Sequence, residues 1–258
     1  MSVPEVLVHR DSPAVAAAIA ARLVTTLVEV QASSGTAHVA LTGGTLGAAC
    51  LEALRRSSSR DAIDWSALHL WWGDDRFVPA EDPDRNERQA REALLDHVPL
   101  DPAKVHAIPA AAPGRDAEAA AAAYAEELRR HARTEDHADV PSFDVCLLGI
   151  GPDAHVASLF PQSPGVRESE RTVVGVHGSP KPPPTRVSLT LPALCAAREI
   201  WIIAAGPAKA AAVRLALSDA GPVQVPAAGA RGRERTVFLL DEAAASALPP
   251  DLRRIASP

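Results

Sequence analysis

The chain of 258 residues is long enough to form one large domain or two small ones with a substantial hydrophobic core. Hydrophobic residues make up 47% and charged residues 22%, which is the balance of an ordinary globular protein. The net charge of -6 argues against a general nucleic-acid-binding protein, although a local cluster of arginine and lysine could still bind an anionic ligand.

The cysteines and the apolar runs further limit the class of protein to which this chain can belong. Cys50, Cys146 and Cys195 are far apart and form no CxxC pair, so neither a zinc ribbon nor a disulfide framework is indicated, and buried reduced thiols are expected. The N-terminal residues MSVPEVLVHRD lack an apolar core of signal-peptide length. No uninterrupted apolar run reaches the roughly 18 residues of a membrane helix. We therefore expect a soluble, cytoplasmic protein.

The first half of the chain alternates strands with helices. Residues 5–10 predict a strand, and Asp11 or Ser12 can cap the next helix, in which Pro13 suits the first turn. The elements that follow are a strand at 37–41, a helix from about residue 46, a strand at 68–72, a helix at 85–98, a loop at 108–116 and a strong helix at 117–133.

The second half opens with the most apolar strand of the chain, residues 143–151, which is expected at the centre of a sheet. The remaining predicted elements are strands at 171–178, 186–191 and 199–206, a helix at 207–218, a closing strand at 235–241 and a short helix at 242–246. This alternation indicates an α/β fold of the Rossmann-like kind, with a mostly parallel sheet and helices on both faces. No long linker divides the chain, so we expect a single domain over residues 1–258.

Ligands of open α/β sheets lie beyond the carboxyl ends of the strands, where this chain has four unusual turns. These turns fall at residues 42–45, 73–76, 149–155 and 206–207. The first three carry the side chains of most chemical interest.

The first turn, in LTGGT, places Gly43 and Gly44 between Thr42 and Thr45, directly before a helix N-terminus. Glycine lets a ligand approach the backbone, and the free N–H groups of the helix attract anions, so the turn suits a phosphate. A tight strand-to-helix turn without a ligand is the alternative, and for this motif alone it is the favoured one.

The second turn, GDDR, joins Asp74 and Asp75 to Arg76. A carboxylate can hold the guanidinium so that it faces an anionic or carbonyl oxygen. Taken alone, the motif is better interpreted as a salt-bridged surface turn. The polar loop that follows has no metal-ligand spacing of the EF-hand kind.

The third turn, GIGPDAH, matches the dinucleotide pattern G-x-G-x-x-A, but Pro152 interrupts the helix that such a site requires. His155 then remains to be explained, with Asp153 two residues before it and a strand end beneath it. An imidazole titrates near neutral pH and can take a proton from water. These residues support a catalytic base and a structural histidine equally. For His69 and His131, in a strand and a polar helix, structural or surface roles are expected.

A stiff proline-rich segment, SPKPPPTR, presents Lys181 and Arg186 directly before a strand. A rigid loop holds cations at low entropic cost, which suits a phosphate. The alternative is a solvated basic loop.

Taken together and in order, five segments resemble the 6-phosphogluconolactonase family over nearly the whole chain. They read LTGGT, GDDRFVP, GIGPDAHVASLFP, SPKPPPTRVSLTLPAL and TVFLLDEAA. The resemblance implies the sugar-phosphate isomerase type of fold, shared with glucosamine-6-phosphate and ribose-5-phosphate isomerases. It also implies hydrolysis of 6-phospho-D-glucono-1,5-lactone to 6-phosphogluconate, the second step of the oxidative pentose phosphate pathway. The expected partner is that small lactone, with no cofactor, metal, nucleic acid or membrane, and the expected assembly is a monomer or weak homodimer.

The resemblance also assigns site residues. His155 matches the family's water-activating histidine, Asp153 matches the aspartate of that turn, and Arg76 is a candidate for the oxyanion, as are the backbone N–H groups of residues 149–155. The expected substrate- and phosphate-binding residues are Thr42, Gly43, Gly44, Thr45, Asp74, Asn86, Lys181 and Arg186.

Three positions depart from the family pattern. Asp75 replaces a glutamate, Arg85 replaces the serine before Asn86, and Ala154 replaces a glycine. An alanine with positive φ would be strained by about 1 kcal/mol and readily exchanged for glycine, so we expect a negative φ at Ala154 and an undisturbed His155.

Two other functions compete with lactone hydrolysis. Sugar-phosphate isomerases or deaminases of the same fold resemble DGHIAFNEP, with a ring-opening glutamate five residues after the histidine, where this chain has Phe160. A sugar-phosphate-binding protein that has lost catalysis is favoured only by Ala154.

Overall fold

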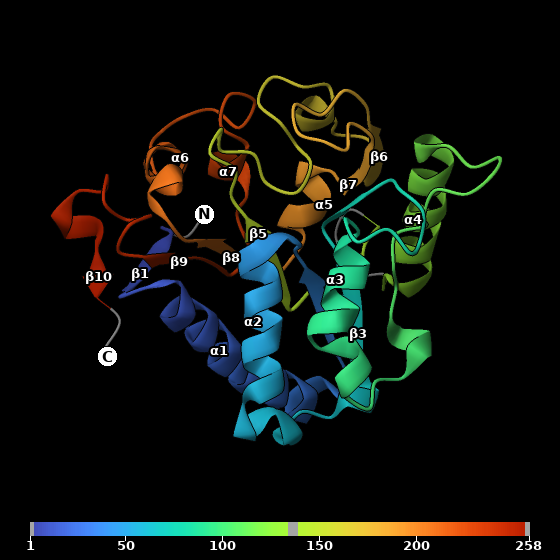
Figure 1. Ribbon diagram of the computed structural model, residues 1–258, viewed down its shortest axis with the longest axis horizontal. Helices are drawn as coiled ribbons and strands as arrows, with labels where there is room; N and C mark the ends of the chain where they lie inside the picture. The colour runs from blue at the N-terminus through green and yellow to red at the C-terminus, as the bar shows by residue number, and fades with distance from the viewer. Residues whose placement is uncertain (1–2, 134–138, 256–258) are drawn as a thin grey trace.

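Two sheets form the framework of the computed structural model, which describes residues 3–133 and 139–255 (Figure 1). A seven-stranded parallel sheet has the order β10-β1-β9-β8-β5-β2-β3, and a three-stranded antiparallel sheet has the order β4-β7-β6. The strands are β1 (Glu5–His9), β2 (Ala37–Leu41), β3 (Leu68–Trp72), β4 (Asp74–Arg76), β5 (Val145–Gly149), β6 (Val173–Val176), β7 (Arg186–Leu189), β8 (Glu199–Ala204), β9 (Arg235–Asp241) and β10 (Arg254–Ile255).

Helices cover the large sheet on both sides: Figure 1 shows α1 and α2 on one side of β8 and β9, with α6 and α7 on the other. Helix α4 packs on β6 and β7 of the small sheet. The helices are α1 (Ser12–Ser34), α2 (Gly44–Arg56), α3 (Asn86–Ala93), α4 (Ala117–His131), α5 (Leu191–Cys195), α6 (Ala210–Ala216) and α7 (Pro226–Gly229). Short 3-10 helices span Ser58–Ala62, Trp65–Ala67, Leu95–His97, Pro102–Lys104, Gly165–Arg167, Pro207–Lys209 and Pro250–Leu252. The predicted α/β class with a mostly parallel sheet is confirmed.

Helix α1 has the start that its sequence predicts. The Asp11 side chain accepts a hydrogen bond from the N–H of Ala14 at 2.9 Å, Pro13 lies in the first turn, and Gly35 ends the helix with a φ of 80°. Length and composition alone would let this helix cross a membrane. Core helices pass the same test, and α1 buries one face, including Ile19 and Leu23, in the protein interior, so the test is weak evidence for a membrane span.

Strand β5 lies between β2 and β8 in the large sheet, and its residues Val145 to Leu148 are buried. Burial on both faces explains why its sequence is a continuous apolar run, as predicted. One cluster of buried hydrophobic side chains extends from this sheet to β6 and β7. The three cysteines are free thiols; Cys50 and Cys146 are buried, and Cys195 is half-buried.

The small antiparallel sheet was not predicted. The segments 171–178 and 186–191 form strands, β6 and β7, but they pair with each other and lie outside the large sheet. The GDDR motif, expected to be a turn, forms β4, which pairs with β7 so that Arg76 lies opposite Arg186. Strand pairing of this kind depends on tertiary contacts that local residue patterns do not record.

Two predicted helices differ from expectation. The helix expected at 85–98 ends at Ala93, because Leu94 adopts a φ of -147°, and the chain continues as the 3-10 helix Leu95–His97. The short helix expected at 242–246 is absent, and turns take its place. There the carboxylate of Asp241 accepts the N–H of Ala244 at 2.7 Å, a local bond that competes with a regular helix.

Candidate active site

A cleft of about 610 Å³ opens at the carboxyl ends of β2, β5, β8 and β9, next to β4 and β7 of the small sheet. This volume is typical of small-molecule sites. Every site residue expected from the sequence lines the cleft except Asp153, which hydrogen-bonds a residue that does. The lining residues from that set are Thr42, Gly43, Gly44, Thr45, Asp74, Arg76, Asn86, His155, Lys181 and Arg186.

The glycine turn joins β2 to the N-terminus of α2. Helix α2 starts at Gly44, whose φ is 82°, and no side chain of the described residues caps its first N–H groups. A Cβ atom at residue 43 would overlap the Oδ1 atom of Asn86, so glycine is required there. The Thr42 hydroxyl accepts the N–H of Gly149 at 3.2 Å and ties this turn to the end of β5. Uncapped N–H groups on the cleft wall are donors for an anion.

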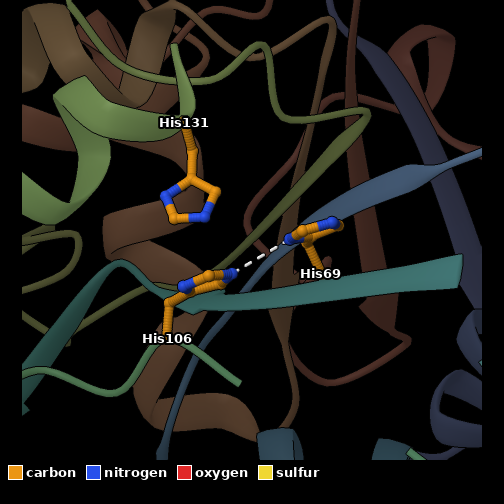
Figure 2. A group of neighbouring side chains, drawn as sticks. All are labelled: His69, His106 and His131. Carbon is orange, nitrogen blue, oxygen red and sulfur yellow. Dashed lines mark hydrogen bonds between the residues drawn. The ribbon is translucent and has the colours of Figure 1, made fainter. Parts of the chain in front are cut away.

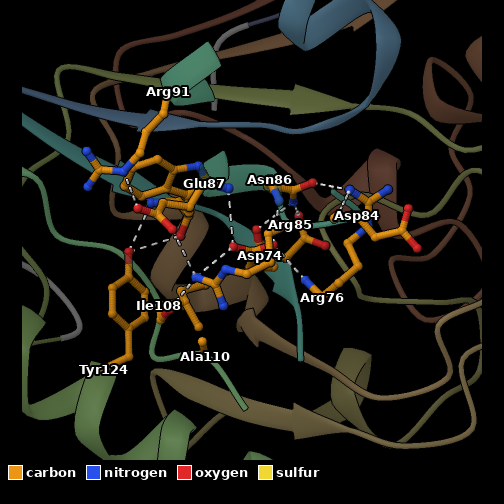
Figure 3. A network of polar contacts seen from close by, with 12 residues as sticks. Asp74, Arg76, Asp84, Arg85, Asn86, Glu87, Arg91, Ile108, Ala110 and Tyr124 are labelled. Atoms are coloured by element: carbon orange, nitrogen blue, oxygen red, sulfur yellow. Dashed lines mark hydrogen bonds and ion pairs between the residues drawn. The ribbon is translucent and has the colours of Figure 1, made fainter. Parts of the chain in front are cut away.

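A chain of hydrogen bonds positions Arg76 on the cleft wall (Figure 3). The side-chain amide of Asn86 donates to the backbone oxygen of Asp74 at 2.8 Å, and its Oδ1 atom accepts from Nη1 of Arg76. The same Nη1 donates to the backbone oxygen of Asp84 at 3.0 Å. The Nε of Arg76 is buried and has no hydrogen-bond partner among the described residues. Arg76 therefore has a fixed guanidinium with unused donor capacity.

Asp75 and Arg85, two of the departures from the family pattern, form a buried ion pair at 3.2 Å. Asp75 also accepts the N–H groups of Asn86 and Arg76 at 2.7 and 2.8 Å. Burial raises the pKa of Asp75 to about 6, against the lowering effect of Arg85. Arg85 donates to the backbone oxygen of Ile108 at 2.8 Å and is only 2% exposed. Arg85 thus anchors the loop, and the adjacent Asn86 lines the cleft.

His155 and Asp153 form the pair that their spacing predicts. Nδ1 of His155 and Oδ1 of Asp153 are 2.5 Å apart, and the imidazole is 13% exposed. Burial lowers the pKa of His155 below its usual value, although Asp153 opposes the shift. The pKa of Asp153 is also below its usual value. Burial raises this pKa, but His155 and Lys181 together lower it by more. At neutral pH the pair is therefore a neutral imidazole beside a carboxylate.

The prediction of a negative φ at Ala154 is wrong: its φ is 65°. The N–H of Ala154 donates to the backbone oxygen of Gly151 at 2.9 Å, and its own oxygen accepts from Ala227 at 3.0 Å. The methyl group is 1% exposed. These contacts offset the strain of about 1 kcal/mol that a left-handed alanine carries. The imidazole of His155 nevertheless lines the cleft, so the strained turn has not displaced it.

The position at which isomerases have a glutamate has a different role here. Phe160 is 4% exposed, and its ring centroid lies 4.6 Å from that of His155. The aromatic ring supports the imidazole and provides no carboxylate for ring opening.

The proline segment brings Lys181 and Arg186 to the cleft by different routes. The guanidinium of Arg186 is buried and donates to the backbone oxygens of Lys181, Pro182 and Pro183 at 3.2 to 3.3 Å. It thereby orders the loop that carries Lys181. Lys181 lines the cleft and has no ion pair with a carboxylate in the part of the chain that is described.

Lys209 lines the same cleft and was missed by the sequence analysis. The turn at Gly206 was noted, but nothing in GPAK marks its lysine. Nζ of Lys209 donates to the backbone oxygen of Ile150 at 2.7 Å, and burial, followed by the charge of Lys181, lowers the pKa of Lys209. Within the described ranges no carboxylate pairs with it. Two ammonium groups acting on each other across a cleft indicate an anion-binding site.

Known proteins resemble this chain over most of its length. The family model described as glucosamine-6-phosphate isomerases/6-phosphogluconolactonase matches residues 10–238. A 6-phosphogluconolactonase from Streptomyces coelicolor is 64% identical over 251 residues, covering 96% of each chain. The enzyme of that name from Mycobacterium tuberculosis is 49% identical and covers 93% of this chain and 96% of its own.

Solved structures show the same relationship. A 6-phosphogluconolactonase structure from Trypanosoma brucei has a TM-score of 0.82 at 28% identity and covers 95% of this chain and 99% of its own. A monomeric glucosamine-6-phosphate deaminase has a TM-score of 0.78 at 18% identity and shows a shared fold alone. The chain belongs to the glucosamine-6-phosphate isomerase/6-phosphogluconolactonase family.

Proposed function

We propose that this protein hydrolyses 6-phospho-D-glucono-1,5-lactone to 6-phosphogluconate, the second step of the oxidative pentose phosphate pathway. Relatives that are 64% and 49% identical over nearly their whole length carry the name 6-phosphogluconolactonase. The observation that carries the proposal is the pair of a neutral His155 imidazole and the Asp153 carboxylate. It lies in a cleft that also holds Lys181 and Lys209, neither of which has a carboxylate partner among the described residues.

In the proposed mechanism, His155 removes a proton from a water molecule as the water oxygen attacks the lactone carbonyl. The depressed pKa keeps the imidazole unprotonated at neutral pH, so it is ready to act as a general base. Asp153 accepts the hydrogen bond from Nδ1–H, which leaves Nε2 as the basic atom and stabilises the imidazolium that forms. The imidazolium then gives its proton to the ring oxygen of the lactone as the bond between the former carbonyl carbon and this oxygen breaks.

Arg76 is our candidate for stabilising the oxyanion of the tetrahedral intermediate. Its guanidinium is held by Asn86 and Asp84, and Arg76 lines the cleft. The other candidate donors for the oxyanion are the backbone N–H groups of residues 149–155. Three of them already have acceptors, because the N–H groups of Gly149, Gly151 and Ala154 donate within the protein. A preorganised donor that needs no rearrangement is the kind that lowers such a barrier.

The phosphate is proposed to lie between the uncapped N-terminus of α2 and the two lysines, Lys181 and Lys209. Both features are suited to a dianion, and both line the same cleft. Arg186 acts indirectly, by ordering the loop of Lys181. Binding of the distant phosphate orients the lactone carbonyl toward His155.

We further propose that residues 1–258 act as one domain in the cytoplasm, as a monomer or weak homodimer without a nucleic-acid or membrane partner. The shared hydrophobic cluster of the two sheets supports a single domain. Sedimentation of the purified chain at several concentrations tests the assembly.

One assay tests the proposed reaction against the isomerase or deaminase alternative. The chain is mixed with freshly made 6-phosphogluconolactone, and acid release is followed at constant pH. In parallel, glucosamine 6-phosphate is supplied and ammonia is measured. We expect accelerated acid release and no ammonia, because Phe160 occupies the position of the ring-opening glutamate. Ammonia release without acid release would establish the deaminase, and inactivity on both would favour the non-catalytic binding protein.

A further inference from the structure

Three histidines from separate segments converge outside the cleft (Figure 2). His69 comes from β3, His106 from the segment that follows the 3-10 helix Pro102–Lys104, and His131 from the last residue of α4. One nitrogen of each lies within 4.8 Å of the other two, and Nδ1 of His69 is 3.0 Å from Nε2 of His106. None of the three lines the cleft. Only structural or surface roles were expected for His69 and His131 from the sequence, and no metal was expected.

Glu127 holds the outer nitrogens of two of these rings. Its Oε1 atom is 2.7 Å from Nδ1 of His106, and its backbone oxygen is 3.0 Å from Nδ1 of His131. Each Nδ1 therefore carries the hydrogen, and each Nε2 keeps its lone pair. In Figure 2 the Nε2 side of His131 faces the other two rings. Metal-binding histidines are characteristically oriented in this way by a carboxylate or carbonyl on the second nitrogen.

We propose that His69, His106 and His131 form a binding site for a divalent transition-metal ion such as Zn²⁺, with water as the fourth ligand. Three neutral imidazoles and a water are a recurrent ligand set for zinc. The ligand atoms would be Nδ1 of His69 and Nε2 of the other two. The hydrogen that now lies between His69 and His106 would move to Nε2 of His69, which leaves a lone pair on Nδ1 of His69 for the metal.

The spacing of the rings is close to what a metal requires. Ligand atoms around a tetrahedral zinc ion are roughly 3.4 Å apart, given metal–nitrogen distances of about 2.0 to 2.1 Å. The pair His69 and His106 already lies near this spacing, but their nitrogens face each other in a hydrogen bond, so both rings would turn toward the ion while His131 moves closer. His131 can make this adjustment because it ends its helix and its side chain is 29% exposed, which also leaves a path for the ion.

The local charges and ring contacts are compatible with a bound cation. The Lys104 ammonium donates to the backbone oxygen of Ser66 at 2.5 Å, and Arg130 pairs with Glu127. The ring of Trp71 stacks on His106 with centroids 3.8 Å apart, which fixes the plane of that imidazole. The site would tie α4 to the edge strand β3.

Calorimetric titration of the metal-stripped, tag-free full chain with ZnCl₂ tests the proposal. We expect one equivalent to bind with a dissociation constant in the micromolar range or below. The same protein with Co²⁺ should show the intense visible absorption of a four-coordinate ion. Zinc at about 100 times the dissociation constant should raise Tm by roughly 5 °C or more.

Variants locate the bound ion. His131→Ala and His69→Gln should weaken binding at least tenfold, and Glu127→Ala, which removes an outer partner, should weaken it by about 10- to 100-fold. His97→Ala, on the surface, and His155→Ala, in the cleft, should bind zinc like the unaltered chain. Circular dichroism of each metal-free variant checks its fold.

Two results would overturn the proposal. One is the absence of one-to-one binding by the unaltered chain. The other is binding that is lost in His155→Ala but kept in His131→Ala, which would place the ion in the cleft. The Co²⁺ spectrum of the unaltered chain decides the question if a variant fails to fold, because an octahedral, weakly absorbing ion would also contradict the site.

Discussion

His155 and the group His69, His106 and His131 place imidazoles in two very different settings. His155 lies in a glycine turn at a strand end, pairs with a carboxylate two residues away and faces a cleft. The other three come from a strand, a loop and a helix end, and they face one another. Burial lowers the pKa of His155 and also that of His69 and His106. A depressed pKa therefore does not distinguish the two settings, whereas their neighbours do.

The difference explains which site the sequence could predict. The parts of the His155 turn are contiguous, so glycine, aspartate and histidine appear together in one motif. The residues His69 and His131 are 62 positions apart, and they meet only because α4 returns to the edge strand β3. A single sequence contains no local signal for such a meeting.

The largest effect is expected on the lactonase rate, which should depend on His155 and not on His131. His155→Asn should lower the lactonase rate by on the order of 10² to 10⁴, because it removes the general base, while affinity for 6-phosphogluconate changes little. The matched variant His131→Asn should retain the full rate. Steady-state kinetics at neutral pH measures both, and full activity in His155→Asn would reject this residue as the base.

The second effect concerns the cations that share the cleft with His155. Lys181→Ala and Lys209→Ala should each lower kcat/KM for the phosphorylated lactone by about 10- to 100-fold, the worth of one charge-assisted hydrogen bond. Hydrolysis of unphosphorylated gluconolactone serves as the control and should hardly change. Equal losses on both lactones would show that the lysines serve folding or chemistry.

The pH dependence of kcat/KM tests the lowered pKa of His155 without a substitution. Its pKa lies below the usual 6.5, so the basic form persists as the pH falls through 6.5 and is lost only below the depressed value. The logarithm of kcat/KM should therefore stay level from pH 8 to about 6.5 and then decline on the acid side. Unphosphorylated gluconolactone controls for ionisation of the phosphate. A midpoint above 6.5 on both lactones contradicts the burial effect.

The smallest effect concerns the strained turn beside His155. Ala154→Gly relieves about 1 kcal/mol of strain but loses a buried methyl group and gains unfolded-state entropy, so the free energy of unfolding should change by less than about 1 kcal/mol. Ala154→Val should destabilise by more than about 1 kcal/mol, because a β-branched residue tolerates positive φ poorly. Urea denaturation distinguishes them, and a stabilising valine would contradict the φ of 65°.

The fold could be predicted where local patterns decide it. The strands β2, β3 and β9 begin and end as expected, and Asp11 caps α1. The small sheet was missed because β4 is only three residues long and forms by pairing with β7, far along the chain.

The site could be predicted where a motif is contiguous, as for the turns of Thr42 and His155. Ala154 was misjudged because its strain is offset by Ala227, which is distant in sequence. Lys209 was missed because a lysine after a turn is ordinary until the fold directs it into the cleft. In each case the deciding partner comes from another segment.

The crystal structure of the complex with 6-phosphogluconate would test the proposed roles of His155 and the lysines together. We expect the product's carboxyl carbon at the His155 end of the cleft, with a carboxylate oxygen within about 3.5 Å of Nε2. Its phosphate should contact Lys209 and the first N–H groups of α2. A reversed product, with phosphate at His155, or a product bound outside the cleft would contradict the proposed mechanism.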